Sequence, residues 1–337
     1  MKTKILYVER KPSAGAVSLE KVFRQIAESL SSRDFETFFQ RLSYPNDALG
    51  TLKNLLFYKK EQADIYHITG HVHYIALVLP SDRTILTVHD AGILRIRSGL
   101  RKYILKKLLF DLPIKKLKYI TAVSEMTKKE IVYYTKCDAE KIRVIENPLQ
   151  KHFYATDKKK FNAECPTILQ IGTTANKNLY NLIKALEGIS CRLVIIGELA
   201  VDAVNLLREK RINYTNKSNL ENDEIREEYA DADIVTFCST FEGFGLPIIE
   251  AQAMLTPVVT SYISPLKEVA GEKAAAFADP SDSESIRHSI LRVINDESFR
   301  ENLVKRGIEN IKKYQPEKIA VSYENLYREI STGQLMQ

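Results

Sequence analysis

Short runs of β-branched and aromatic residues alternate with longer stretches of helical pattern along most of this chain. Such alternation is typical of β-α-β units, which build a parallel sheet covered by helices. Strands are expected in two series: residues 2–7, 35–39, 63–69, 84–90, 118–124 and 141–146, and then 166–172, 191–197, 212–216, 231–238 and 257–261. We therefore expect an α/β protein made of two similar parallel-sheet halves.

Chain length and the segment between the two series indicate two domains. A chain of 337 residues exceeds what one hydrophobic core usually serves. Residues 147–166 are polar, rich in lysine and flanked by prolines, which is the composition of a linker. We expect an N-terminal domain at residues 1–150 and a C-terminal domain at 160–315, with a last helix over 316–331 that begins with proline and packs back on the first domain.

The composition excludes several classes of protein. Hydrophobic residues make up 45% of the chain and charged residues 27%, as in folded globular proteins. The longest apolar run, residues 74–80, is far shorter than the ~20 residues of a membrane span. The first ten residues lack the apolar region and cleavage site of a signal peptide, and the four cysteines form no CxxC pair, which fits reduced thiols. We expect a cytoplasmic protein.

Ligand-binding residues are expected at the carboxyl ends of the strands, where open parallel sheets bind their ligands. Two such sheets that face one another would form a cleft. The residues just past each predicted strand are therefore the candidates: Glu9, Arg10, Lys11 and Gly15; His71 and His73; His89 and Asp90; Ser124 and Glu125; residues 172–177; Gly197 and Glu198; and residues 242–246.

The stretch FEGFGLPIIEAQA, residues 241–253, places two glutamates on either side of a strand-to-helix turn. Gly243 and Gly245 leave backbone amides uncovered and allow positive φ, and Pro247 suits the first helical position. Together with the helix dipole, these amides favour an anion or a ligand rich in hydroxyls. Alternatively, Glu242 is a solvated loop residue and Glu250 only complements the helix dipole.

At this turn the sequence resembles the family 4 retaining glycosyltransferases of GT-B fold, whose signature is Glu-x7-Glu in a loop and helix written like EGFGLPIIEA. The resemblance implies two Rossmann-like domains that face a central cleft. It also implies transfer of a sugar from a UDP- or GDP-sugar to a glycan or lipid-linked acceptor, with retention of configuration and without a metal or other cofactor. It extends over TVHD (87–90), TAVSEMTKKEI (121–131), ENPL (146–149), IGTTANKN (171–178), LVIIG (193–197), EEYADADIV (227–235) and SPLKEVAGEKAAAFADPSD (264–282).

The resemblance assigns the donor-binding residues. It implies that Glu242 contacts the hydroxyls of the donor sugar and that Glu250 contacts the ribose hydroxyls. The backbone amides that assist Glu242 are those of Gly243, Phe244, Gly245 and Leu246.

The loop IGTTANKN follows a predicted strand and precedes a helix, so Lys177 can meet the donor pyrophosphate beside Gly172. The alternative is an ordinary solvated lysine. The family usually pairs this lysine with an arginine a few residues earlier, and here Thr173 or Thr174 stands instead. Gly172, Thr173, Thr174 and Lys177 are therefore expected to bind the donor, with a less complete phosphate clamp than in the family.

The remaining candidates belong to the first half of the chain. His89 is expected to touch the donor sugar or the attacking hydroxyl, so His89, Glu242 and Lys177 form the predicted catalytic set. A histidine after a strand is also common as a hydrogen-bonded structural residue. Acceptor contacts are expected from Gly15, His71, His73 and Asp90.

Metal binding is not expected. The histidines of HITGHVH, residues 67–73, lack a fourth ligand at zinc spacing. Asp231 and Asp233 match the Asp-x-Asp motif of another glycosyltransferase architecture, but they precede a strand, where short acidic side chains accept hydrogen bonds from turn amides. We interpret them as structural.

Residues 95–118 contain nine lysines and arginines against one aspartate, with Leu100, Tyr103, Ile104 and Leu108 on one face. A basic amphipathic segment of this kind is expected to dock on an anionic membrane surface, which would place the protein on the inner face of the membrane. The alternative is a solvated basic face over the N-terminal core. Nucleic acid is not an expected partner, because no recognised binding motif accompanies the charge.

Two other functions fit parts of the pattern. A nucleotide-sugar epimerase could use the same architecture without a second sugar acceptor. A non-catalytic sugar-nucleotide or polysaccharide-binding subunit is conceivable because the family's arginine is missing. The sugar, the base and the acceptor are not specified by these residues.

Overall fold

The structure is a computed structural model of the chain, and it describes residues 2–11 and 18–333. By its internal contacts the chain divides into two compact units. Unit 1 contains Met1–Pro148 and Gln315–Gln337, and unit 2 contains Leu149–Tyr314. Each unit has a six-stranded sheet in which all paired strands are parallel, which confirms the predicted α/β fold with two parallel sheets.

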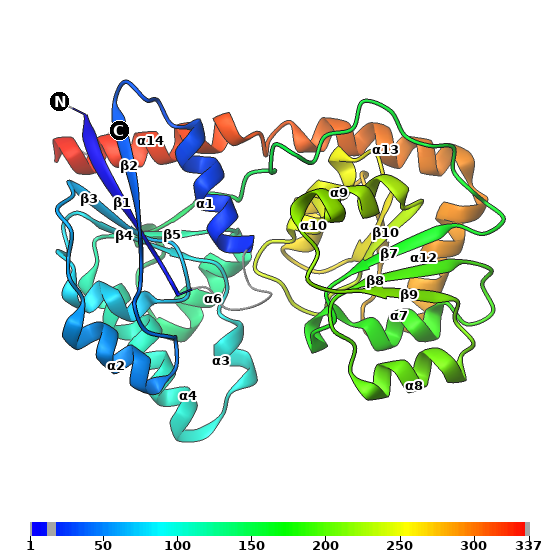
Figure 1. Cartoon of the computed structure of the whole chain (residues 1–337), viewed down its shortest axis with the longest axis horizontal. Coiled ribbons are helices and arrows are strands. Elements are labelled where there is room, and N and C mark those ends of the chain that lie inside the picture. The colour runs from blue at the N-terminus through cyan, green and yellow to red at the C-terminus, as the bar shows by residue number, and fades with distance from the viewer. Residues whose placement is uncertain (1, 12–17, 334–337) are drawn as a thin grey trace. The chain divides into compact units, whose positions relative to one another are not determined.

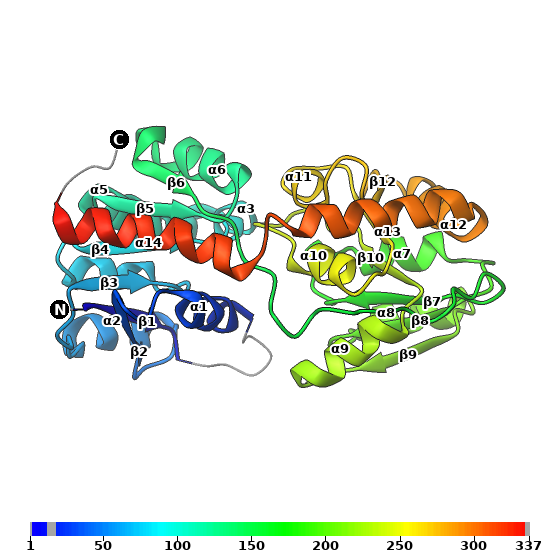
Figure 2. The same ribbon diagram turned by 90° about the horizontal axis from the view of Figure 1, so that it is seen from above.

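The sheet of unit 1 has the strand order β2-β1-β3-β4-β5-β6, and Figure 2 shows the strands side by side in this order. All six strands lie where the sequence predicts them. The central strands β3, β4 and β5 are buried along their whole length, as expected for a parallel sheet with helices on both faces. The strands are β1 (Thr3–Glu9), β2 (Phe35–Arg41), β3 (Ile65–Ile68), β4 (Thr84–Val88), β5 (Tyr119–Ala122) and β6 (Ile142–Val144).

Helices cover both faces of this sheet. Figure 1 shows α1 and α14 on one face and α2, α3 and α4 on the other. The helices of unit 1 are α1 (Ser18–Ser29), α2 (Ala48–Phe57), α3 (Gly92–Ile96), α4 (Gly99–Lys106), α5 (Leu112–Lys116), α6 (Glu125–Thr135) and α14 (Pro316–Thr332). Short 3-10 turns lie at η1 (His73–Val78) and η3 (Ala139–Lys141), and a π-helical turn, η2 (Lys107–Asp111), joins α4 to α5.

Helix α14 is held against unit 1 by buried polar contacts. The Tyr327 hydroxyl lies 2.8 Å from His67 Nδ1 and 3.1 Å from the Tyr7 hydroxyl. Glu329 of the same helix forms an ion pair with Arg143 at 2.6 Å. These contacts connect the last helix to strands β1, β3 and β6, although more than half of the chain separates α14 from them in sequence.

The sheet of unit 2 has the order β12-β11-β10-β7-β8-β9, so the strand order reverses between β7 and β10. Five of its strands lie where the sequence predicts them: β7 (Thr167–Ile171), β8 (Arg192–Ile196), β9 (Tyr214–Lys217), β10 (Ile234–Phe237) and β11 (Val258–Ser261). The sixth, β12 (Ala276–Ala278), was not predicted, because its alanine-rich sequence lacks the β-branched residues that mark a strand.

Helices α9, α10 and α13 lie on one face of this sheet, and α7, α8 and α12 lie on the other (Figure 1). The helices of unit 2 are α7 (Leu179–Ala185), α8 (Val201–Glu209), α9 (Asn222–Asp231), α10 (Leu246–Ala253), α11 (Leu266–Ala270), α12 (Ser283–Asn295) and α13 (Glu297–Ile311), with a 3-10 turn at η4 (Ala175–Lys177).

The segment interpreted as a linker is bound to unit 2 along much of its length. Leu149 N–H donates to the carbonyl of Tyr314 (2.7 Å), and Ala155 N–H donates to the carbonyl of Ala253 (3.1 Å). Phe153 is buried and packs edge-on against Tyr229. Residues 149–158 are therefore part of unit 2, and their polar composition conceals these anchoring contacts.

Candidate functional site

The reversal of strand order in unit 2 brings two loops together at the carboxyl ends of β7 and β10. This is the place where open parallel sheets bind ligands. Asn176 joins the loops, because its side-chain amide donates to the carbonyl of Phe241 (3.1 Å) and to Glu242 Oε1 (3.2 Å). Its own carbonyl accepts from Thr240 N–H (2.8 Å). The IGTTANKN loop and the loop before α10 therefore form one site.

Lys177 and Glu242, predicted to bind different parts of one ligand, contact each other across these loops. Lys177 Nζ lies 2.6 Å from Glu242 Oε1, and the two side chains are 20% and 14% exposed. Gly172, with φ of +86°, lies under the stem of Lys177, and a Cβ there would come within 2.9 Å of Lys177 Cγ. The glycine thus lets the ammonium reach Glu242. A ligand with both phosphate and hydroxyl groups could engage the cation and the carboxylate together.

The turn before α10 requires glycine at one position. Gly245 has φ of +117°, and a Cβ there would lie 2.8 Å from Leu266 Cδ2. Helix α10 begins at Leu246, and Pro247 lies within its first two positions, where proline is favoured. Phe244 is 4% exposed and packs edge-on against Tyr314, so its side chain is not available to a ligand.

Glu250 is buried within α10. Glu250 is 8% exposed, and the Tyr229 hydroxyl donates a hydrogen bond to Glu250 Oε2 at 2.7 Å. Burial and the adjacent Glu250 carboxylate raise the pKa of Tyr229 well above its usual value, so the phenol keeps its proton. Glu250 lies outside the first turn of α10 and is held by Tyr229, so it does more than complement the helix dipole.

Neither threonine of the IGTTANKN loop supplies the positive charge of the family's arginine. Thr173 donates through its hydroxyl to the carbonyl of Glu198 at 2.6 Å, which ties the loop to the end of β8. Thr174 donates to Asn176 Oδ1 at 2.8 Å and so holds the amide that joins the two loops. Both hydroxyls therefore stabilise the loop that carries Lys177.

His89 lies at the carboxyl end of β4 in unit 1 and is 4% exposed. Its Nε2 is 2.8 Å from the carbonyl of Thr69, and because a carbonyl only accepts, Nε2 must carry the hydrogen. Burial, with a smaller effect from His71, lowers the pKa of His89 to about 3, so the ring is neutral at physiological pH. Nδ1 is thus a bare acceptor, buried and without a partner among the described residues. It can accept a hydrogen bond from a hydroxyl group.

The acceptor-side candidates divide into surface and core residues. His71 Nε2 lies 3.7 Å from Asp90 Oδ2, and both side chains are about one third exposed. His73 is 1% exposed, bonds the carbonyl of Leu109 through Nδ1 (2.7 Å) and packs against Phe110. Its position in the core of unit 1 argues against the predicted acceptor contact. Gly15 lies outside the described residues.

Asp233 is confirmed as a structural residue. It is 3% exposed, and its carboxylate accepts from the amides of Thr167 (2.8 Å) and Asn162 (3.2 Å). Across residues 2–11 and 18–333, no group of three or more His, Cys, Asp or Glu side chains could hold a metal ion.

Tyr229 has a defined role near this site that was not assigned from the sequence. It lies within a quoted motif, but no spacing rule distinguishes it from a solvated polar residue. Asn176 and Glu9 were candidates because of their places near strand ends, but neither was given a role. Glu9 is the last residue of β1, is 1% exposed and pairs with Arg24 (2.9 Å) and Arg41 (3.4 Å).

Comparisons with known proteins agree with this geometry. Residues 20–151 match the model of Glycosyltransferase Family 4, and residues 155–310 match that of Glycosyl transferases group 1. O-antigen chain mannosyltransferase RfbU of Salmonella typhimurium is 28% identical over 216 residues, which cover 62% of this chain and 60% of that protein. O-antigen chain mannosyltransferase B of Escherichia coli is 39% identical over 100 residues, which cover 30% of this chain and 26% of that protein. The chain thus matches less than two thirds of either relative.

Solved structures show the same fold. Anabaena HepE in complex with UDP and glucose has a TM-score of 0.79 at 15% identity, with 97% of this chain and all of that chain covered. WaaG, a glycosyltransferase involved in lipopolysaccharide biosynthesis, has a TM-score of 0.73 at 12% identity, with 96% and 99% covered. The fold is therefore that of the GT-B glycosyltransferases. The chain belongs to the family 4 glycosyltransferases.

Proposed function

We propose that the protein transfers a sugar from a nucleotide-sugar donor to a glycan or lipid-linked acceptor, in the synthesis of a cell-surface polysaccharide or glycolipid. The transfer retains the anomeric configuration and needs no metal ion. The observation that carries the proposal is the contact between Lys177 and Glu242 where the strand order of unit 2 reverses. The O-antigen mannosyltransferases and the UDP complex of HepE support this class of reaction.

In this proposal the donor binds at the joined loops of unit 2. Lys177 leaves Glu242 and binds the pyrophosphate, and Glu242 then accepts hydrogen bonds from the sugar hydroxyls. Glu250 binds the ribose. Amides at the start of α10 assist, because the helix dipole favours negative charge at that end. Unit 1 supplies His89 and the exposed pair His71 and Asp90 for the acceptor side.

The proposed reaction exchanges two bonds at the anomeric carbon. The bond to the departing phosphate oxygen breaks, and a bond to the acceptor oxygen forms on the same face of the sugar. The phosphate accepts the proton of the acceptor hydroxyl. Lys177 and the loop amides stabilise the negative charge that develops on the leaving group. His89 is neutral, so its Nδ1 takes part only as a hydrogen-bond acceptor.

A ligand screen followed by product analysis tests the proposal. The melting temperature is measured with UDP, GDP, ADP and their sugars, because a ligand that prefers the folded state raises it. The active donor is then incubated with acceptor fractions, with and without EDTA. We expect a glycoside of retained configuration and equal yield in EDTA. A free, altered sugar nucleotide would indicate an epimerase, and donor binding without hydrolysis or transfer would indicate a non-catalytic subunit.

We also propose that unit 1 docks on an anionic membrane, at the inner, cytoplasmic face. None of the helices in the described part of the chain is long and apolar enough to cross a bilayer. Part of the predicted segment is core, since Phe110 and Ile114 are buried, and Lys106 and Lys107 pair with Asp111. Helix α4 nevertheless exposes three apolar side chains, Leu100, Tyr103 and Ile104.

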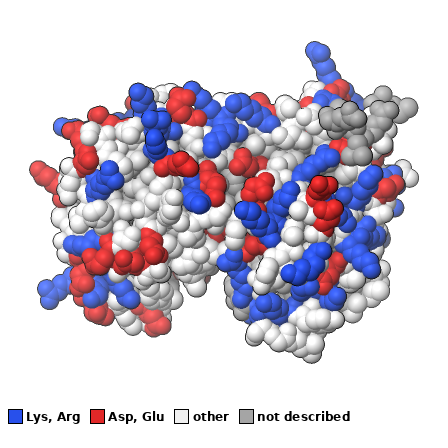
Figure 3. Space-filling view, turned by 180° about the vertical axis from the view of Figure 1, so that it is seen from behind, with Lys and Arg blue, Asp and Glu red and all other residues white. Residues whose placement is uncertain are grey.

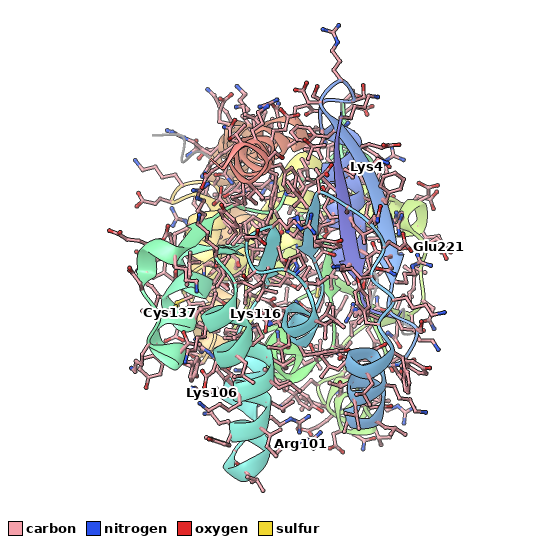
Figure 4. All side chains as sticks on the ribbon, turned by 90° about the vertical axis from the view of Figure 1, so that its left-hand side faces the viewer. Lys4, Arg101, Lys106, Lys116, Cys137 and Glu221 are labelled. Carbon is pink, nitrogen blue, oxygen red and sulfur yellow. The ribbon has the colours of Figure 1, made fainter. Side chains whose placement is uncertain are left out.

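A second apolar surface lies on α2, which Figure 4 shows at the same end of unit 1 as α4, whose Arg101 and Lys106 are labelled. Basic side chains also gather over the unit 1 side of the face seen in Figure 3. A membrane with anionic headgroups could bind both surfaces, since its acyl chains accept the apolar side chains and its headgroups attract the lysines and arginines. The exposed apolar residues of α2 are Leu49, Leu52, Leu56 and Phe57, with relative exposures of 53–67%.

Vesicle flotation tests this docking. The wild-type protein is expected to float with vesicles that contain phosphatidylglycerol, but not with phosphatidylcholine alone, and to dissociate as salt rises. Leu52→Gln/Leu56→Gln should lose most of this binding, because two large apolar side chains no longer insert. Val201→Gln removes an apolar residue of unit 2 that is even more exposed, at 75%, and should float like wild type. Equal flotation of the α2 variant and wild type would contradict the proposal.

A further inference from the structure

Lys158 lies in the segment that leads from Pro148 into unit 2, and three oxygens bind its ammonium. Lys158 Nζ donates to the carbonyls of Tyr229 (2.7 Å) and Ala230 (2.9 Å), and to the hydroxyl of Thr256 (2.8 Å). The two carbonyls belong to the last turn of α9, and Thr256 follows the end of α10. A cation at this position is favoured by the α9 dipole. The ammonium therefore joins the ends of α9 and α10.

Tyr229 connects this junction to Glu250. Its carbonyl is held by Lys158, and its hydroxyl donates to Glu250 Oε2 at 2.7 Å. The Tyr229 ring is fully buried and packs edge-on against Phe153, with 5.2 Å between ring centroids. Direct contacts thus run from Lys158 through Tyr229 to the carboxylate proposed to bind ribose.

We propose that Lys158 and Tyr229 are positioning residues for Glu250, and that they set how strongly the protein recognises the ribose of its nucleotide. The inference rests on the proposed function, in which Glu250 accepts hydrogen bonds from the ribose. Because Tyr229 is buried, it acts only through Glu250. Because the hydrogen bond to Oε2 already orders the Glu250 carboxylate, ligand binding loses less side-chain entropy and the affinity is higher.

Deprotonation of Lys158 should weaken this arrangement. Burial, with a smaller effect from Lys159, lowers the pKa of Lys158 to about 8, and Asp233 and Asp231 oppose the shift. The ammonium has three hydrogens for three acceptors, whereas the neutral amine has two. One contact is therefore lost as the pH rises through about 8. The Tyr229 phenol does not titrate in this range, because its pKa is raised well above its usual value.

Titration calorimetry with UDP and GDP, and with their 2′-deoxy and 3′-deoxy counterparts, tests the inference at pH 7. Wild type should prefer the ribonucleotide by about 10-fold, as expected for a hydrogen bond to a charged group. Tyr229→Phe, which removes only the hydroxyl, should reduce the preference to about 3-fold or less. Lys158→Met should do the same. Lys160→Met, an exposed neighbour in the same segment, should keep the wild-type preference.

The pH dependence separates positioning from a general loss of stability. The wild-type preference for ribose should fall between pH 7 and pH 9, in step with deprotonation of Lys158. Lys158→Arg, which stays charged throughout this range, should show no such fall. Melting temperatures confirm that each titrated variant is folded.

Glu250→Ala distinguishes failure of this inference from failure of the proposed function. If Glu250→Ala keeps the full ribose preference, Glu250 does not bind ribose and the proposed role of that residue is wrong. If Glu250→Ala loses the preference but Tyr229→Phe and Lys158→Arg behave as wild type at every pH, the positioning role of Lys158 and Tyr229 is overturned.

Discussion

Replacing Lys177 by methionine is expected to lower kcat/KM for sugar transfer by about 10²–10³-fold, the usual effect of removing one group that stabilises developing negative charge. Methionine keeps the aliphatic stem that lies over Gly172 but removes the ammonium that contacts Glu242. The loss should fall on the chemical step as well as on donor binding, because the charge on the phosphate grows as the sugar leaves. Initial rates at several donor concentrations measure both effects.

Lys184→Met is the matched control for this experiment. Lys184 is an exposed residue of α7, the helix that directly follows the IGTTANKN loop. Its replacement removes the same charge from the same part of unit 2 and should leave the rate within about 2-fold of wild type, as is usual for surface sites. If Lys177→Met is as active as this control, Lys177 has no role in the reaction.

Lowering the pH from 7 to 5 is expected to destabilise unit 1 by about 6 kcal/mol, which is about 2 kcal/mol for each of three buried imidazoles. His67, His73 and His89 are at most 4% exposed, and burial lowers the pKa of each from 6.5 to about 3. Below pH 6.5 the unfolded chain binds protons that the folded unit excludes. Stability is therefore lost progressively between about pH 6.5 and pH 3, and a loss of this size is comparable to the whole stability of many domains.

Urea unfolding between pH 5 and pH 7, followed by tyrosine fluorescence, measures this loss. His73→Asn keeps a donor for the carbonyl of Leu109 but does not titrate, so its stability should fall less steeply with acid. His288 is exposed in unit 2, and His288→Asn should leave the pH dependence unchanged. If His73→Asn shows the same slope as wild type, the buried neutral state of His73 is contradicted.

Periodicity predicted the sheets well because parallel strands buried on both faces need continuous apolar runs. The same rule missed β12, where burial is achieved with alanine. Composition, in contrast, indicated a linker at residues 147–166, whereas residues 149–158 belong to unit 2. Lys158 donates hydrogen bonds to carbonyls at the end of α9. Composition cannot predict such a contact, because the partners are about 70 residues away in the sequence and meet only in the folded chain.

The candidate site was predictable where a residue's role depends on a strand end. Lys177 and Glu242 each follow a strand, and the strand order brings their loops together. Their direct contact was not predictable, because it requires the stem of Lys177 to lie over Gly172. The burial of His73 and the exposure of the α2 leucines likewise depend on packing between elements distant in sequence.

The central claim is that the joined loops of unit 2 bind the donor through Lys177 and Glu242. Titration calorimetry of the preferred nucleoside diphosphate, with no sugar attached, tests it most directly. Glu242→Gln frees Lys177 from its competing carboxylate and should bind the nucleotide about 5-fold more tightly, the equivalent of about 1 kcal/mol. Lys177→Met should bind it more weakly than wild type. Equal affinities in all three proteins would contradict the account.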